Sequence, residues 1–196
     1  GLGDVYKRQI GLRPIDLHLS SLRLMGAQIE TEGGVLSCRC PDGLRGEKIT
    51  LSFPSVGATE NILIAAASAD GETVILNAAR EPEIADLADF LCSCGAHISG
   101  AGSGEITVCG MKKLHSAEHT VIPDRIIAST YMAAAAVTGG DIRILDTRAE
   151  HITPVIPVFE QAGCKVDCGE NSVHISAPVR LRSVQTCLLY TSPSPR

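Results

Sequence analysis

The sequence predicts a mixed α/β (α+β) fold assembled from repeated βαβαββ units, because of an internal repeat and an alternation of strands and helices. A five-residue pattern around Gly26 recurs around Gly95 and Gly163, with the glycines 69 and 68 residues apart. Further markers keep the 69-residue step: Pro54 with Pro123, Gly71 with Gly140, and Asn77 with Asp146. Self-similarity at one fixed offset is the signature of a repeated structural unit. We count two and a half copies.

The first half of the complete copy contains two strands and a helix. Residues 49–53 alternate in polarity, as a half-buried strand does. The turn at residues 54–57 leads into an alanine-rich helix over residues 59–69, which Gly71 ends. Residues 73–77 then form a short apolar run that is typical of a buried strand.

A second helix and a hairpin complete the copy. Pro82 is tolerated in a first helical turn, and Gly95 is a typical helix end. Between them, apolar side chains recur at the spacing of a helix that covers a core: Ile84, Leu87, Ala88 and Leu91. Residues 96–99 and 105–109 predict a hairpin around a glycine-rich turn.

The next copy predicts the same order of elements. We expect a strand over 116–121, a helix over 125–137, a strand over 141–145, a helix over 153–161 and a hairpin over 164–176. A helix over 15–25 belongs to the partial copy that comes first. Strands that alternate with helices favour partly parallel sheets covered by helices on one side.

Composition excludes several classes of protein. The chain has 196 residues, 44% of them hydrophobic and only 3% aromatic, and a net charge of −5. This apolar content rules out extensive disorder, and no apolar run reaches the roughly 18 residues of a membrane span. Nucleic-acid binding needs a basic stripe or stacking aromatics, which are absent from the sequence.

The cysteines fit neither a disulfide framework nor a zinc site. Without Cys187 they number seven, partly in Cys-x-Cys pairs, whereas zinc usually takes Cys-x₂₋₄-Cys pairs. We expect reduced cysteines in the core of a cytoplasmic protein, with no metal and no cofactor.

Both ends of the chain are interpreted as translated adapter DNA. Back-translation of residues 187–196 gives a DNA whose reverse complement, extended by one base, encodes residues 1–9. Protein physics gives no reason for such a relation, so we expect residues 1–9 and 187–196 to be scars of library preparation and exclude them from fold reasoning. The remaining residues, 10–186, are expected to be an internal fragment of a longer protein.

Four loops could bind an anion. Arg13 offers a planar fork at a helix start, where free N–H groups also point outward. Residues 54–59 join a strand to a helix and contain capping side chains and a glycine. Residues 80–83 follow a buried strand, and residues 123–125 replace the Pro54 loop with charged side chains. Each loop also has a purely structural explanation as a helix cap, a solvated charge or a local ion pair.

Four strings in order give the chain a resemblance to a known family. They are residues 11–18 (GLRPIDLH), 53–61 (FPSVGATEN), 77–84 (NAAREPEI) and 122–125 (IPDR). With them, residues 10–186 resemble the enolpyruvyl transferases, specifically the branch of the UDP-N-acetylglucosamine 1-carboxyvinyltransferases. The resemblance implies transfer of the enolpyruvyl group of phosphoenolpyruvate to the 3-hydroxyl of UDP-N-acetylglucosamine, the first committed step of peptidoglycan synthesis and so of cell wall biogenesis.

The resemblance also implies two domains and a set of binding residues. Residues 10–121 would be the later part of the first domain, and residues 122–186 the start of the second. One group of residues would hold the uridine and diphosphate: Arg13, Pro14, Ile15, Asp16, Leu17, Phe53, Pro54, Ser55 and Val56. Some family members have Lys where Phe53 stands, so this chain has one cation fewer there. A second group would lie beside the cleft and hinge: Arg80, Glu81, Asp124 and Arg125.

The fragment is expected to contain no catalytic residue. In the family a reactive Cys or Asp precedes the Arg13 string, and the general base lies beyond residue 186. No histidine of the chain has a metalloprotease or nucleophile pattern. Three alternatives remain open: a 3-phosphoshikimate 1-carboxyvinyltransferase, a non-catalytic UDP-sugar-binding paralogue, and a repeat scaffold for protein partners.

Overall fold

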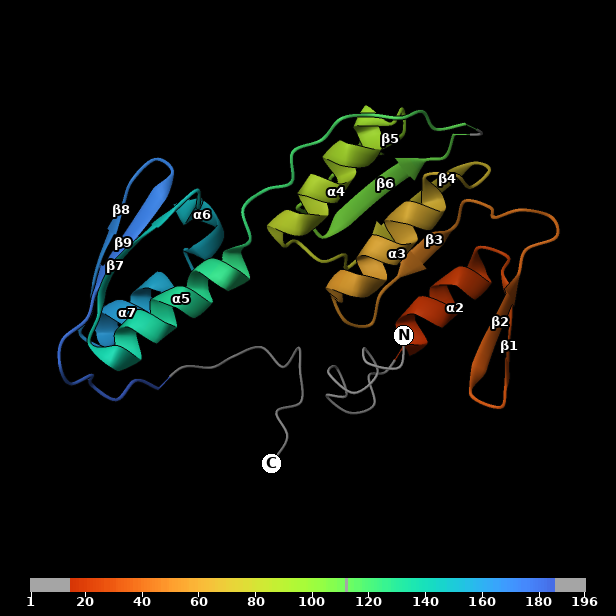
Figure 1. Ribbon diagram of the computed structural model, residues 1–196. Coiled ribbons are helices and arrows are strands. Elements are labelled where there is room, and N and C mark those ends of the chain that lie inside the picture. The colour runs from red at the N-terminus through yellow and green to blue at the C-terminus, as the bar shows by residue number, and fades with distance from the viewer. Residues whose placement is uncertain (1–14, 112, 186–196) are drawn as a thin grey trace. The chain divides into compact units, whose positions relative to one another are not determined.

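The computed structural model describes residues 15–111 and 113–185, which fall into two compact units (Figure 1). Among these residues, unit 1 ends at Thr120 and unit 2 begins at Val121. Each unit contains a sheet, helices and its own buried apolar cluster. The α/β class predicted from the sequence is confirmed.

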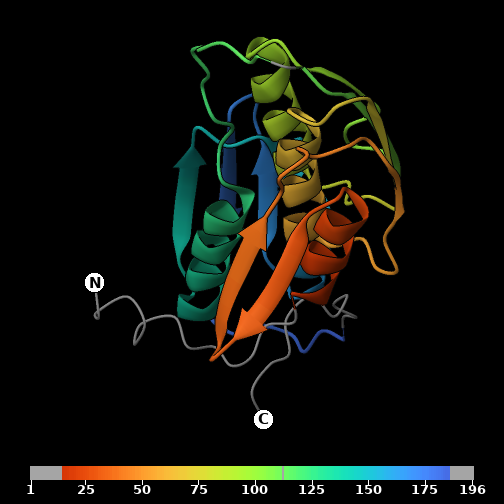
Figure 2. The same ribbon diagram turned by 90° about the vertical axis from the view of Figure 1, so that its right-hand side faces the viewer.

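Unit 1 starts with the partial copy of the repeat. Helix α2 (Asp16–Leu24) leads into an antiparallel ribbon of β1 (Gln28–Glu32) and β2 (Val35–Arg39), which Figure 2 shows as a pair of opposed arrows. Nearly every ribbon side chain is exposed. The sequence analysis predicted the helix but assigned no element to the ribbon.

The complete copy forms a four-stranded sheet in the order β3-β4-β6-β5. Strand β3 (Lys48–Thr50) is parallel to β4 (Glu72–Leu76), while β6 (Glu105–Cys109) pairs antiparallel with both β4 and β5 (His97–Ser99). The helices are α3 (Val56–Ala66) and α4 (Pro82–Ser93), and α2, α3 and α4 lie side by side in Figure 1. Against the prediction, β3 is shorter and α3 begins three residues earlier, because Ser55 already caps the helix.

Unit 2 repeats this plan with fewer strands. Helix α5 (Arg125–Thr138) precedes an antiparallel sheet in the order β7-β9-β8, made of β7 (Asp141–Leu145), β8 (Lys165–Cys168) and β9 (Ser172–Ser176). The helix expected over residues 153–161 is shorter, α7 (Ile156–Gln161), and a short helix that was not predicted, α6 (Ala149–Ile152), comes before it. They separate around Pro154, since a proline has no N–H to donate to the carbonyl four residues before it. Within the described ranges, every helix is too short or too polar to cross a membrane.

The backbone torsions bear out the repeat. Gly26, Gly95 and Gly163 end α2, α4 and α7 with φ of 100°, 102° and 100°, which only glycine adopts without strain. Of the described residues other than glycine, Asn77 and Asp146 alone have positive φ, 56° and 49°. They follow β4 and β7 at equivalent positions, and Asn and Asp tolerate this conformation better than other side chains. The 69-residue step is therefore a step in structure as well as in sequence.

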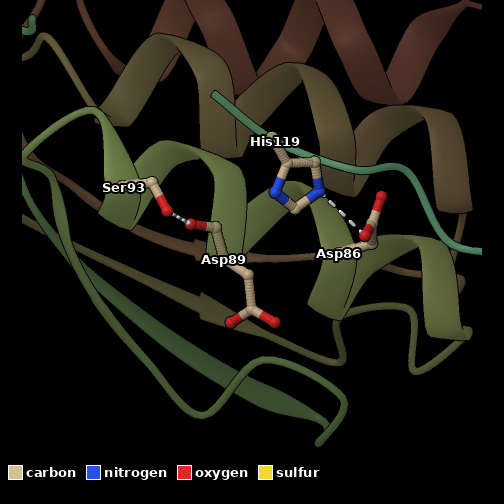
Figure 3. Close-up of polar contacts among 4 residues, drawn as sticks. All are labelled: Asp86, Asp89, Ser93 and His119. Atoms are coloured by element: carbon tan, nitrogen blue, oxygen red, sulfur yellow. Dashed lines mark hydrogen bonds and ion pairs between the residues drawn. The ribbon is translucent and has the colours of Figure 1, made fainter. Parts of the chain in front are cut away.

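The strand predicted over residues 116–121 is absent, and that prediction was wrong. Counting by the repeat, these residues correspond to β3, but they run as an extended segment along α4. The His119 Nε2 atom lies 2.9 Å from Asp86 Oδ1 (Figure 3). The His119 ring also packs on Phe90, with centroids 5.6 Å apart. The backbone N–H of His115 donates to the Cys94 carbonyl at 2.9 Å. These helix contacts replace the sheet partners that β3 has, just before the chain passes into unit 2.

The cysteines are less buried than we expected. Seven are free in the described part of the chain, and of these only Cys94 and Cys164 are buried. Cys38, Cys92, Cys109 and Cys168 are exposed, because they fall on outward-facing positions of short strands and a helix. Burial raises the pKa of the Cys164 thiol, so this group stays protonated and is a poor nucleophile.

Candidate functional site

The first predicted binding string ends inside the described residues. Arg13 and Pro14 lie outside them, while Ile15 precedes α2 and is exposed. Asp16 opens the helix, and its negative charge is favourable beside the N-terminal end of the helix dipole. Leu17 is half-buried and packs against the core of unit 1. The helix start is thus fixed by an apolar anchor next to exposed polar backbone.

The second string forms the entrance to α3. Phe53 and Pro54 are exposed, and Ser55 is the N-cap residue, whose Oγ accepts from the Ala58 N–H at 3.4 Å. A hydroxyl that accepts in this way can still donate its own hydrogen. The buried Thr59 hydroxyl holds this loop in place. Its Oγ1 donates to the Ser55 carbonyl at 2.8 Å and accepts from the Ala79 N–H at 3.1 Å. The geometry leaves Ser55 able to donate to an anion.

The structure brings these two strings together. Helices α2 and α3 pack side by side, and Leu17 and Val56 join the same apolar cluster. A polar contact also links the helices, with Nδ1 of His18 2.5 Å from the Asn61 amide nitrogen. No metalloprotease or nucleophile pattern marks His18 in the sequence. Its position directly after the first string was the available signal.

The third predicted group, Arg80 and Glu81, stands at the start of α4. Glu81 is the N-cap residue, and its carboxylate accepts from the Arg80 backbone N–H at 2.9 Å. The Arg80 guanidinium passes over Gly104, where an added Cβ would come within 2.8 Å of a terminal nitrogen. Arg80 is exposed, so its charge is accessible to a ligand.

The pKa of Glu60, a carboxyl group in the second turn of α3, is affected by charged residues of the neighbouring helices α2 and α4. The pKa of Glu60 is raised, first by burial and then by the negative charge of Glu83, while His18 has a smaller opposite effect. His18 of α2 contacts Gly57 and Asn61 of α3. The N–H of Ala79, just before α4, donates to Thr59 Oγ1 of α3. The ends of α2, α3 and α4 that carry the predicted residues of unit 1 therefore gather in one region.

The last predicted pair belongs to unit 2. Asp124 caps α5, with Oδ1 accepting from the N–H groups of Ile126 at 2.8 Å and Ile127 at 3.0 Å. Arg125 is the first residue of the helix and is half-buried. A strong local cap is a sufficient structural reason for Asp124, although its second oxygen has no part in those two bonds.

Unit 2 also contains a pocket that the sequence did not indicate. It has a volume of about 240 Å³ and lies where the entrance to α6 meets the turn between β8 and β9. Its lining is mostly polar: Arg148, Ala149, Glu150, Glu170 and Asn171. None of the predicted site residues takes part in it.

The fold is one that solved structures share. The enolpyruvyl transferase NikO from Streptomyces tendae superposes with a TM-score of 0.75 at 23% identity, covering 87% of this chain and 44% of that chain. EPSP synthase from Acinetobacter baumannii superposes with a TM-score of 0.60 at 27% identity, covering 89% and 42%. The repeated βαβαββ plan is thus that of the enolpyruvyl transferases.

Sequence comparison places the chain within this group. The family model for EPSP synthase (3-phosphoshikimate 1-carboxyvinyltransferase) matches residues 7–194, and the chain belongs to this family. The match reaches into both segments interpreted as adapter scars, so that interpretation stays a prediction.

Three of the curated relatives that the chain matches share one enzyme name. UDP-N-acetylglucosamine 1-carboxyvinyltransferase 2 of Caldanaerobacter subterraneus is 47% identical over 186 residues, 95% of this chain and 44% of the relative. UDP-N-acetylglucosamine 1-carboxyvinyltransferase of Finegoldia magna is 48% identical over 178 residues, 90% and 42%. That of Acidiphilium cryptum is 52% identical over 157 residues, 80% and 38%. The chain spans less than half the length of these relatives.

Proposed function

We propose that the protein belongs to the UDP-N-acetylglucosamine branch of this family. It moves the enolpyruvyl group of phosphoenolpyruvate to the 3-hydroxyl of the sugar, with release of phosphate. The observation that carries the proposal is the 45–52% identity to relatives of that name along most of the chain. No metal or cofactor is needed for it. Its place in peptidoglycan synthesis and in the cytoplasm follows from the same proposal.

In this reaction the role of this chain is to bind substrate. Residues 13–17 and 53–56 hold the uridine and diphosphate, with the Arg13 fork and the Ser55 hydroxyl as donors to phosphate oxygens. The adjacency of the starts of α2 and α3 supports this role. Arg80 and Glu81, together with Asp124 and Arg125, orient the cleft and hinge. The reaction needs an acid for the vinyl carbon and a base for the hydroxyl, and we assign neither role to a described residue.

The rival substrates are separated by direct titration. Calorimetry of the 196-residue chain should show binding of UDP-N-acetylglucosamine and none of 3-phosphoshikimate. Arg13→Ala should weaken this binding by about 1–3 kcal/mol, the range for a hydrogen bond to a charged group. Arg39→Ala, an exposed arginine on β2, is the matched control and should leave the affinity unchanged. Binding of 3-phosphoshikimate instead would favour the sister activity and refute the proposal.

Turnover is tested in a protein of the relatives' full length that contains this segment. Release of phosphate from phosphoenolpyruvate should then require UDP-N-acetylglucosamine. Nucleotide binding without any release would identify the non-catalytic paralogue.

A further inference from the structure

His18 connects the two helix starts that carry the proposed nucleotide-binding strings. It lies in the first turn of α2, immediately after Leu17, and is half-buried. Its Nδ1 is 2.5 Å from the Asn61 side-chain amide, and its Cε1 would be 3.2 Å from a Cβ built on Gly57. Gly57 and Asn61 are four residues apart and so share one face of α3. The imidazole therefore spans the first two turns of α3.

The fit explains the glycine at position 57. Gly57 lies inside α3 and has no positive φ, so its backbone is one that any residue adopts. In such a helical position glycine is less favourable than alanine. A Cβ at this position would take room from the His18 ring, because a separation of 3.2 Å from the ring carbon requires a shift of a few tenths of an ångström. The glycine is thus explained by packing rather than by backbone conformation.

The contact fixes one string relative to the other. Leu17 ends the first string and is followed by His18, while Val56 ends the second and is followed by Gly57. A hydrogen bond and a packed ring between these neighbours limit sliding of α2 along α3. A site held in its bound arrangement before the ligand arrives avoids the cost of ordering it on binding.

We propose that His18 is a positioning residue for UDP-N-acetylglucosamine: with Asn61 and Gly57 it aligns residues 15–17, at the start of α2, with residues 53–56, so that both helix starts meet the diphosphate together. The inference rests on the proposed function. It assigns to His18 no proton transfer and no contact with the reacting atoms.

The first test is a double-mutant cycle on the 196-residue chain, with UDP-N-acetylglucosamine affinity measured by calorimetry. His18→Ala and Asn61→Ala should each weaken binding about three- to tenfold, which is the contribution of one hydrogen bond. The double variant should bind no more weakly than either single variant, because both remove the same bond. His18→Gln, which can still bond to Asn61, should recover most of the affinity. His97→Ala, an exposed histidine on β5, is the control and should bind normally.

The second test uses Gly57→Ala, which we expect to be harmful when His18 is present and stabilising when His18 is replaced. In the wild-type background Gly57→Ala should displace the His18 ring and weaken nucleotide binding. In the His18→Ala background the same change should leave affinity unaffected and raise the urea midpoint of unit 1, since alanine favours the helix once the ring is gone. A purely structural contact would change the urea midpoint in these variants without changing the affinity of the folded protein.

The outcomes separate the two proposals. If the folded wild-type chain fails to bind UDP-N-acetylglucosamine at millimolar concentration, the proposed function is refuted and the positioning role with it. If the wild type binds and His18→Ala binds equally well, only the positioning role is refuted. Additive losses in the double variant would refute the bridge between His18 and Asn61.

Discussion

Leu63 and Met132 occupy equivalent positions, 69 residues apart, and provide a matched pair of core truncations. Both side chains are fully buried, Leu63 in the apolar cluster of unit 1 and Met132 in that of unit 2. Replacing a buried Leu or Met by Ala removes its transfer free energy and leaves a cavity, at a cost of about 2–5 kcal/mol. We expect each loss to fall on the unit that contains the cavity.

The consequence should differ between the units because their sizes differ. Stability of about 0.05–0.15 kcal/mol per residue gives roughly 3–10 kcal/mol for the described part of unit 2 and roughly 5–15 kcal/mol for unit 1. Met132→Ala therefore removes a large share of the stability of unit 2. Leu63→Ala should leave unit 1 mostly folded at low denaturant concentration.

Hydrogen exchange followed by peptide mass spectrometry resolves the two units in one sample. In Met132→Ala, peptides from β7 and β9 should lose protection at low urea while peptides from β4 and β6 keep theirs. Leu63→Ala should show the converse at higher urea. If either substitution lowers protection of both units equally, the two cores behave as one cooperative body and the reasoning fails. Leu36→Ala, on the exposed β2 ribbon, should change neither.

Two further predictions concern unit 2. Asp124→Ala should destabilise the unit by about 1 kcal/mol in urea unfolding, because two N–H groups of α5 lose their acceptor, whereas Asp124→Asn should retain most of the cap. The pair of His174 and Asp141, 2.8 Å apart, should make stability depend on pH. The hydrogen bond to Asp141 raises the His174 pKa above 6.5, so this stabilisation is complete below pH 6.5 and is lost as the pH rises through the folded pKa. The hydrogen bond from His174 lowers the Asp141 pKa below 3.8, so the carboxylate's share is present above pH 3.8 and is lost as the pH falls through its folded pKa. Thermal unfolding should thus show extra stability from about pH 4 to 6.5. Asp141→Asn should remove most of it and leave the weaker contact of His174 with Asp167 at 3.6 Å; an unchanged pH profile in that variant would contradict the prediction.

The elements that the sequence predicted best are those whose signals are local. Helix α4 has a proline at its start, a glycine at its end and an apolar stripe between them, and each signal acts within the helix itself. The β7 strand was also predicted with its observed bounds. The strand expected over residues 116–121 failed because its partner is decided elsewhere: His119 binds Asp86 of α4, a contact between residues 33 apart that no local pattern encodes.

The candidate site was predictable to a similar degree. The strings at the starts of α2 and α3 could be identified from Arg13 and from the Ser55 cap, since those residue types have a chemical reason to stand at helix starts. The bridge between His18 and Asn61 could not, because it depends on how α2 packs on α3. A histidine in a sequence has many uses, and only its neighbours in space distinguish them.

The comparison of α3 with α5 shows the same division between local and non-local signals within the repeat. Ala58 and Ile62 of α3 are completely buried, whereas their counterparts on α5, Ile127 and Tyr131, are 55% and 60% exposed. In unit 1 the preceding helix, α2, packs along α3, and its Leu17 joins the cluster that contains Ala58 and Ile62. Among the described residues of unit 2, no helix comes before α5 to take that place. A repeat therefore encodes the inward positions of each copy, such as Leu63 and Met132, because the copy's own sheet determines them. Its lateral faces depend on which helix lies beside them, which is why Ala58 and Ile62 are buried while Ile127 and Tyr131 are exposed.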